Sequence, residues 1–146
     1  MATVEIQTPT LTGSLDADFV DLSGNGQPNI VRSTEAMTID ARWYIDGSLA
    51  PSLAGTWYMQ AQFQSSDDVV GEFRQPTAPI AIALDGRHGP SSPYTSSISL
   101  PAGSFNLNSR DSQVYDVTVT LNYHDVNGNP GPMAAFVALD KLQVYA

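Results

Sequence analysis

Two short segments carry oxygen-bearing side chains at alternate positions, the spacing by which calcium-binding loops hold their ion. The candidate metal ligands are Asp21, Ser23 and Asn25 in the first segment and Asp125, Asn127 and Asn129 in the second. Both segments lack the glutamate that closes such a loop, because Arg32 and Phe136 stand at the twelfth position. Asp, Asn and Gly are also ordinary turn residues. A calcium-stabilised surface domain is therefore kept as a second alternative, and no cofactor is predicted.

Three tyrosines form a candidate ligand-binding site of another kind, one for a sugar ring. Tyr44 and Tyr58 fall on the polar sides of two alternating segments, and Tyr94 ends a loop rich in glycine and proline. If the segments of Tyr44 and Tyr58 are neighbouring strands, the two rings form one exposed platform. If they belong to opposite sheets, that platform does not exist. Strands favour tyrosine through β propensity alone, so both interpretations stay open.

Catalytic constellations are absent from the sequence. His88 and His124 are the two imidazoles, and they are not spaced as a pair of metal ligands. No Gly-x-Ser-x-Gly segment occurs, and the adjacent Asp67 and Asp68 suit a solvated turn better than two carboxylates facing across a cleft. The chain has no cysteine, which excludes disulfides and thiolate metal sites. We therefore expect a protein without enzymatic activity.

The elements that must position these side chains are predicted to be β-strands. Apolar and polar residues alternate along residues 37–45, 56–64 and 114–123, which is typical of strands with one buried face. Weaker strand patterns cover residues 4–8, 18–22, 69–73, 80–84, 96–100 and 136–145. Many short strands between turn signals predict an all-β fold. We expect one domain, residues 1–146, folded as a two-sheet antiparallel sandwich of about seven to nine strands.

The segment 133–145 has two interpretations. A helix would fit after Pro132, because proline is favoured at the first helical position. A last strand with a bulge near Asp140 would fit the change of phase in the alternation there. The strand is favoured, since residues 142–145 continue as β and the rest of the chain is β.

Residues 111–117 resemble the segment that enters strand F of immunoglobulin domains. In that segment an aspartate precedes a tyrosine by four residues, and the tyrosine precedes an inward residue by two; here these are Asp111, Tyr115 and Val117. The resemblance implies an immunoglobulin-like sandwich in which the Tyr115 hydroxyl bonds to backbone and Trp57 is the core tryptophan. The chain lacks the cysteine pair of antibody domains. Such a resemblance concerns the fold and carries no function.

The excess of acidic residues argues against nucleic acid and anionic membranes as partners. The formal net charge is −9, from 15 acidic and 6 basic residues, so no basic surface exists for nucleic acid or anionic lipid. No stretch approaches the roughly 20 apolar residues of a membrane helix. Residues 1–6 show no basic segment before an apolar run, so we expect no signal peptide, and no compartment is assigned.

A non-catalytic interaction or structural module is therefore the favoured function. We expect a subunit or accessory of a larger protein assembly, held by a protein partner or by self-association through the Thr- and Gln-rich strand faces. The alternative function is a carbohydrate-binding module that uses the exposed Tyr44 and Tyr58.

Overall fold

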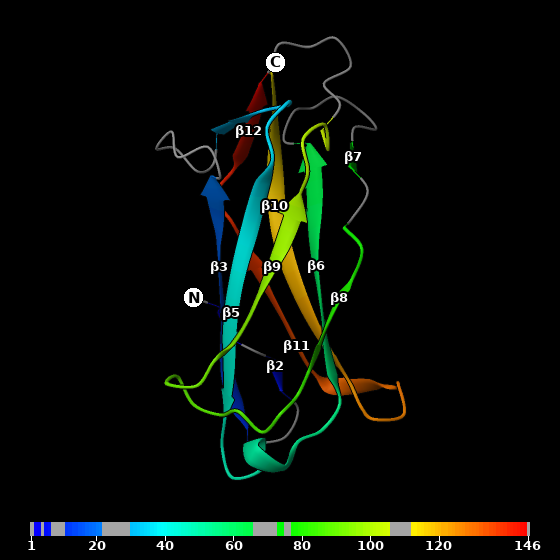
Figure 1. Cartoon of the computed structure of the whole chain (residues 1–146). Coiled ribbons are helices and arrows are strands. Elements are labelled where there is room, and N and C mark those ends of the chain that lie inside the picture. The colour runs from blue at the N-terminus through cyan, green and yellow to red at the C-terminus, as the bar shows by residue number, and fades with distance from the viewer. Residues whose placement is uncertain are drawn as a thin grey trace.

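The computed structural model describes residues 2–3, 5–6, 11–21, 30–65, 73–74, 77–105 and 112–145. These residues form two β-sheets that face each other, with most strands running along one long axis (Figure 1). The described chain has twelve strands and one short 3-10 helix, η1 (Ala50–Ser52). The predicted all-β two-sheet sandwich is confirmed. The strand number exceeds the expected seven to nine because several ribbons are divided into two short strands.

Sheet A, as we call the smaller sheet, has four antiparallel strands. Their order is β1 (Ala2–Thr3), β3 (Thr12–Asp21), β5 (Met37–Asp46) and β9 (Tyr94–Leu100). The N-terminal ribbon changes sheets after its first strand, because β1 pairs with β3 whereas β2 (Glu5–Ile6) pairs with a strand of the second sheet. The start of the chain therefore lies along both layers.

Sheet B, the larger sheet, is built around β6 (Thr56–Ser65) and β10 (Ser112–His124), which pair over the whole length of β6. Its other strands are β11 (Pro130–Ala138), β12 (Leu142–Tyr145), β4 (Ile30–Arg32), β7 (Phe73–Arg74) and β8 (Ile80–Ala83), besides β2. In the described part of the chain all strand pairings are antiparallel except that of β12 with β4. None of the helices in the described part of the chain has the length and apolar character needed to cross a membrane.

The core lies between the sheets and is filled by the inward-facing residues of the predicted strands. Along β5, β6 and β10 every second residue is buried, as the alternation predicted. Trp43 from sheet A and Trp57 from sheet B meet edge to face, with ring centroids 6.3 Å apart. Tyr115 packs against Phe63 and Phe105 at the other end of the core. These rings bury apolar area from both layers, which is the main force joining them.

The C-terminal segment is β-structure, which settles the two interpretations in favour of the strand. Both β11 and β12 pair with β10, and the register shifts by one residue between the pairs Thr118–Ala138 and Tyr115–Leu142. This shift lies at residues 139–141 and is the bulge expected near Asp140. Beside it, the Lys141 ammonium contacts the Asp116 carboxylate at 2.7 Å.

Candidate functional site

Tyr44 and Tyr58 do not share a surface. Tyr44 lies in β5 of sheet A and Tyr58 in β6 of sheet B, and each occupies an outward position of its strand. The interpretation in which the two strands are neighbours is therefore wrong, and with it the joint platform for a sugar ring. Each tyrosine has to be considered with the neighbours of its own sheet.

Tyr94 is a core residue and does not form a ligand-binding surface. Its side chain is 3% exposed, and its ring stacks on Trp43 with centroids 6.0 Å apart. The Tyr94 hydroxyl accepts a hydrogen bond from the backbone N–H of Asp85 at 3.3 Å, and burial raises the pKa of this phenol. Tyr94 therefore anchors the loop that precedes it, which corrects its assignment as a contact residue.

The loop of residues 85–93 is held by its own polar groups. The Arg87 guanidinium donates to the Asp85 carboxylate at 2.9 Å and to the Pro93 carbonyl at 3.3 Å. The hydrogen bond from Arg87 lowers the pKa of the Asp85 carboxyl. His88 is exposed, and its Nδ1 lies 3.1 Å from the Gly86 carbonyl oxygen. These contacts hold the residues of the loop to one another.

The second calcium-like segment is a turn closed by its own aspartate. Oδ1 of Asp125 accepts hydrogen bonds from the backbone N–H groups of Asn127 at 2.9 Å and Asn129 at 3.0 Å. In the first segment, Ser23 and Asn25 lie outside the described residues, and of Asp21 only the backbone is described. Among the described residues no three His, Cys, Asp or Glu side chains are grouped as metal ligands.

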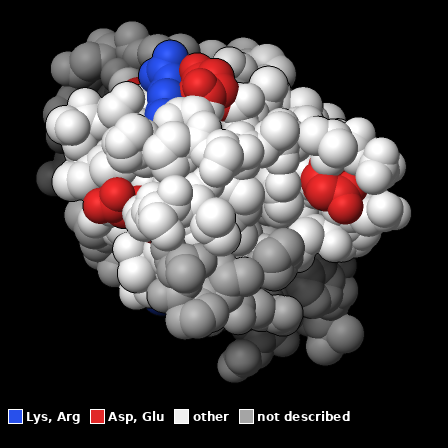
Figure 2. All heavy atoms as spheres, turned by 90° about the horizontal axis from the view of Figure 1, so that it is seen from below, with Lys and Arg blue, Asp and Glu red and all other residues white. Residues whose placement is uncertain are grey.

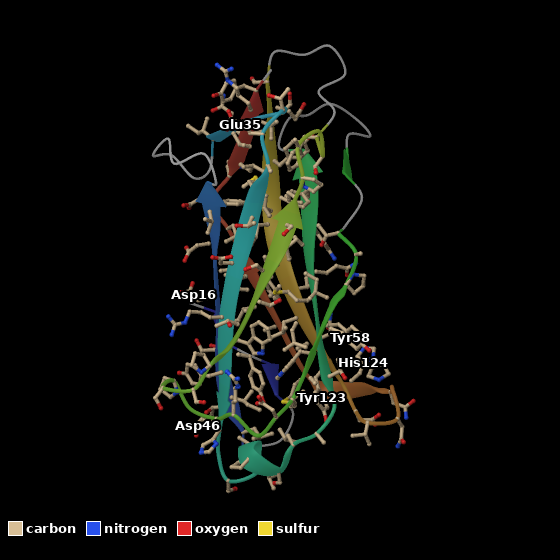
Figure 3. All side chains as sticks on the ribbon, in the orientation of Figure 1. Asp16, Glu35, Asp46, Tyr58, Tyr123 and His124 are labelled. Carbon is tan, nitrogen blue, oxygen red and sulfur yellow. The ribbon has the colours of Figure 1, made fainter. Side chains whose placement is uncertain are left out.

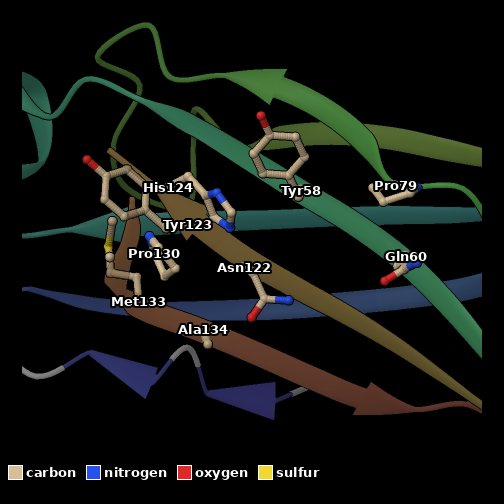
Figure 4. A pocket seen from close by; sticks show the side chains of 10 residues that line it. Tyr58, Gln60, Pro79, Asn122, Tyr123, His124, Pro130, Met133 and Ala134 are labelled. Atoms are coloured by element: carbon tan, nitrogen blue, oxygen red, sulfur yellow. The ribbon is translucent and has the colours of Figure 1, made fainter. Parts of the chain in front are cut away.

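A hollow of about 550 Å³ lies on the outer face of sheet B, near the end where β10 and β11 turn (Figure 4). Its lining comes from β6, β10, β11 and the segment before β8: Tyr58, Gln60, Pro79, Asn122, Tyr123, His124, Pro130, Gly131, Met133 and Ala134. A cavity of this size falls in the range of small-molecule sites. Of the three predicted ligand-binding tyrosines, Tyr58 is the one that lines it.

The strand register explains why these side chains meet. Asn122 in β10 pairs with Tyr58 of β6 on one side and with Ala134 of β11 on the other. Cross-strand partners present their side chains on the same face of a sheet. The Tyr58 and His124 rings lie 4.7 Å apart between centroids and are tilted by 59°. Two aromatic rings and one amide therefore share a single concave surface.

One wall of the hollow is fixed by Thr77. Its backbone N–H donates to the Ala61 carbonyl at 3.0 Å, and its hydroxyl accepts from the Ala61 N–H at 2.9 Å. The Gln60 side chain adds a third bond, since its Nε2 donates to the Thr77 carbonyl at 2.8 Å. These bonds hold the segment with Pro79 against β6. They also orient the Gln60 amide, whose carbonyl oxygen is an acceptor.

The floor of the hollow depends on Gly131. A Cβ atom at this position would collide with the Tyr123 ring, so the close approach of β11 to that ring requires glycine. The register between β10 and β11 shifts at this point, between Asn122 and His124. The Tyr123 hydroxyl donates to the carbonyl of Ala54, and burial, together with the Asp125 charge, raises the pKa of the Tyr123 phenol.

The two outer faces of the sandwich differ in charge. None of the described residues that line the hollow is Asp, Glu, Lys or Arg. On the outer face of sheet A, Asp18 pairs directly with Asp40, and Asp16 pairs with Arg42. In Figure 3 the labelled Asp16 and Asp46 lie on one side of the molecule, and Tyr58 and His124 on the other. Figure 2 shows the sandwich from one end, where few of the described side chains are charged.

No protein-family model and no curated protein matches this chain. Among solved structures, it is similar to a β-glucosidase from Listeria innocua in complex with glucose, with a TM-score of 0.48 and 13% identity over 87% of this chain and 16% of that one. A mutant of that enzyme in complex with laminaribiose gives a TM-score of 0.41 and 12% identity over 89% and 16% of the two chains.

A third similar structure is Spo0M, a sporulation control protein from Bacillus subtilis, with a TM-score of 0.40 and 13% identity over 92% of this chain and 49% of that chain. The chain spans about a sixth of the length of the glucosidase (16%) and about half that of Spo0M (49%). At these scores the similarities assign neither a family nor an activity.

Proposed function

We propose that this protein is a non-catalytic interaction module and that the outer face of sheet B is its recognition surface. The observation that carries the proposal is the charge distribution. The chain has a net charge of −9, yet the described residues at the centre of this face are uncharged. They are Tyr58, Gln60, Gln62, Thr118, Thr120, Asn122, Ala134, Phe136 and Ala138. The cores of interfaces are depleted in charged residues.

Phe136 supports the same face as the contact surface. Its side chain is 64% exposed, in the row formed with Thr120 and Gln60 across sheet B. Aromatic residues are enriched at the centre of interfaces, where they lose contact with water on binding. An uncharged face with an exposed aromatic ring fits a partner whose own contact groups are uncharged.

The absence of enzymatic activity belongs to the same proposal. The titratable groups among the described lining residues of the hollow are Tyr58, Tyr123 and His124. The Tyr123 hydroxyl already donates a hydrogen bond to a backbone carbonyl. This set offers no pair of carboxylates and no Ser, Thr or Cys beside a base. A screen of ester and glycoside substrates is expected to return only the background rate.

The immunoglobulin-like topology is also proposed here. Tyr115 and Val117 are buried in β10, as the resemblance requires, and Trp57 lies in the core. Asp111, the first residue of the resembling segment, lies outside the described residues. In sandwiches of this type, sheet faces and end loops both serve as contact surfaces.

Membership of a larger protein assembly is tested by native mass measurement of an extract of the source organism. We expect the protein in a complex with a protein partner or with further copies of itself. Recovery as a clean monomer would contradict this part of the proposal.

The position of the surface is tested with two lysine substitutions. Phe136→Lys places a charge at the centre of the proposed surface, and Ser99→Lys places the same charge on an exposed outward position of sheet A. We expect Phe136→Lys to abolish co-purification of the partner and Ser99→Lys to preserve it. Retention of the partner by both variants would place the contact elsewhere.

A further inference from the structure

We propose that the hollow beside Tyr58 and His124 binds an uncharged sugar ring, and that an oligosaccharide extends from it across sheet B to Phe136. This inference rests on the proposed function, because it gives the recognition surface of sheet B a saccharide ligand in addition to the protein partner. It concerns a different set of residues from the Tyr44–Tyr58 platform, which the fold excludes.

The two aromatic rings fit the faces of a sugar. A pyranose presents C–H bonds on its faces and hydroxyl groups at its rim, and the negative face of an aromatic ring attracts the C–H side. The rings of Tyr58 and His124, 4.7 Å apart and tilted by 59°, form two adjoining walls of the hollow. Figure 4 shows both rings over β6 and β10, above the side chain of Asn122.

The polar lining suits the hydroxyl groups at the rim. Asn122 is exposed and offers both an N–H donor and a carbonyl acceptor, and Gln60 offers its carbonyl oxygen. Gln60 is already oriented by its bond to Thr77, so little side-chain freedom is lost when a ligand binds. A few oriented polar groups among aromatic and apolar walls are the usual composition of a small-molecule site.

Charge favours a neutral saccharide over an acidic one. The described lining residues include no Lys or Arg side chain that would pair with a carboxylate, sulfate or phosphate. The net charge of −9 opposes the approach of anions. The same lining holds no carboxylate for a cationic ligand. Neutral hexoses and N-acetylhexosamines therefore match the hollow best.

Phe136 extends the site beyond one sugar. It lies in the row next to that of Asn122 and Ala134, because its partner in β10 is Thr120. Phe136 is separated from β6 by β10, a distance of about 10 Å across two strand spacings. An exposed ring at this distance on the same uncharged face offers a stacking position for a later unit of a linear glycan.

The test is calorimetric titration of the full chain with glucose, galactose, mannose and N-acetylglucosamine and with linear tetrasaccharides of each, followed by pull-down on insoluble polysaccharides. We expect at least one neutral series to bind. Tyr58→Ala should weaken that binding about tenfold. Tyr44→Ala, the same substitution on sheet A, should leave it unchanged.

Phe136→Ala separates the two parts of the site. We expect unchanged affinity for the monosaccharide and about fivefold weaker binding of the tetrasaccharide. Ala134→Leu fills the hollow without removing a polar group and should abolish both. Melting curves of all variants show whether each remains folded.

Failure to bind any neutral saccharide at millimolar concentration would overturn the inference, as would preferred binding of acidic saccharides or equal losses in Tyr44→Ala and Tyr58→Ala. A protein that occupies the hollow in place of a glycan would overturn it too. The interaction module itself is judged separately, by the Phe136→Lys and Ser99→Lys pair, so the two failures can be distinguished.

Discussion

The indole rings of Trp43 and Trp57 meet edge to face in the centre of the sandwich, one contributed by each sheet. Both side chains are buried, and neither Nε1 has a hydrogen-bond partner among the described residues. Their contribution to stability therefore comes from ring contact and apolar burial, and each buried N–H opposes it by losing its bond to water.

This arrangement predicts an order of stability for substitutions at Trp57. Trp57→Ala should lower the free energy of unfolding by about 3–5 kcal/mol, because it leaves a large cavity between the sheets. Trp57→Phe should cost clearly less, because the ring contact is partly kept and the unpartnered N–H is removed. Urea unfolding followed by circular dichroism measures both. Equal losses for alanine and phenylalanine would contradict the argument.

Asp18 and Asp40 lie directly opposite each other on the outer face of sheet A. Like charges in such a cross-strand pair oppose folding. Asp40 accepts a hydrogen bond from the Ser97 hydroxyl at 2.6 Å, so Asp18 is the better position to change. Asp18→Asn should raise the free energy of unfolding by about 0.2–1 kcal/mol at low salt. In 1 M salt the gain should nearly vanish, because screening shortens the range of the repulsion to about 3 Å.

Asp16→Asn provides the matched control for this substitution. It removes the same charge two residues away on the same strand, but Asp16 lies opposite Arg42. We expect no gain in stability, or a small loss. If both variants were stabilised equally, the effect would come from net charge and not from the cross-strand pair.

We expect the folded protein to lose stability at alkaline pH, because the phenol of Tyr94 is buried. Burial raises the pKa of its phenol above the ordinary value of about 10, so the folded state binds the proton more tightly than the unfolded state. Its contribution is complete below pH 10 and is lost as the pH rises through the folded-state pKa. Tyr94→Phe should make the decline above pH 10 less steep, in urea midpoints measured from pH 8 to 11.5. An unchanged decline would show that other groups cause it.

Local alternation predicted the buried faces of the long strands but not the partners of those strands. The inward positions of β5, β6 and β10, from Met37 to Tyr123, follow directly from period two. The hollow depends on the pairing of Tyr58 with Asn122, residues far apart in sequence, and on the approach of Gly131 to Tyr123. Neither relationship leaves a local pattern, although Asn122 falls on the polar side of the alternating segment 114–123.

The predicted strand boundaries differ from the observed ones where turn residues interrupt the alternation. The sequence predicts Tyr94 at the end of a loop because it follows Pro93, whereas Tyr94 begins β9 and continues the buried series with Ile98 and Leu100. The sequence pattern does not predict the first half of β3, because Gly13 and Asp16 are poor strand formers. The short β4 pairs in parallel with β12, and three residues are too few to show a period.

Asp125 distinguishes a self-sufficient turn from a calcium site. Because its carboxylate already accepts two backbone N–H groups, Asp125→Ala should lower the free energy of unfolding by about 1 kcal/mol, and Asp125→Asn by less, since the amide keeps one acceptor oxygen. The melting temperature of the unmodified protein should be the same in calcium and in chelator. A calcium-induced rise that disappears in Asp125→Ala would make this turn a metal site. A rise that persists in the variant would place the ion elsewhere in the chain.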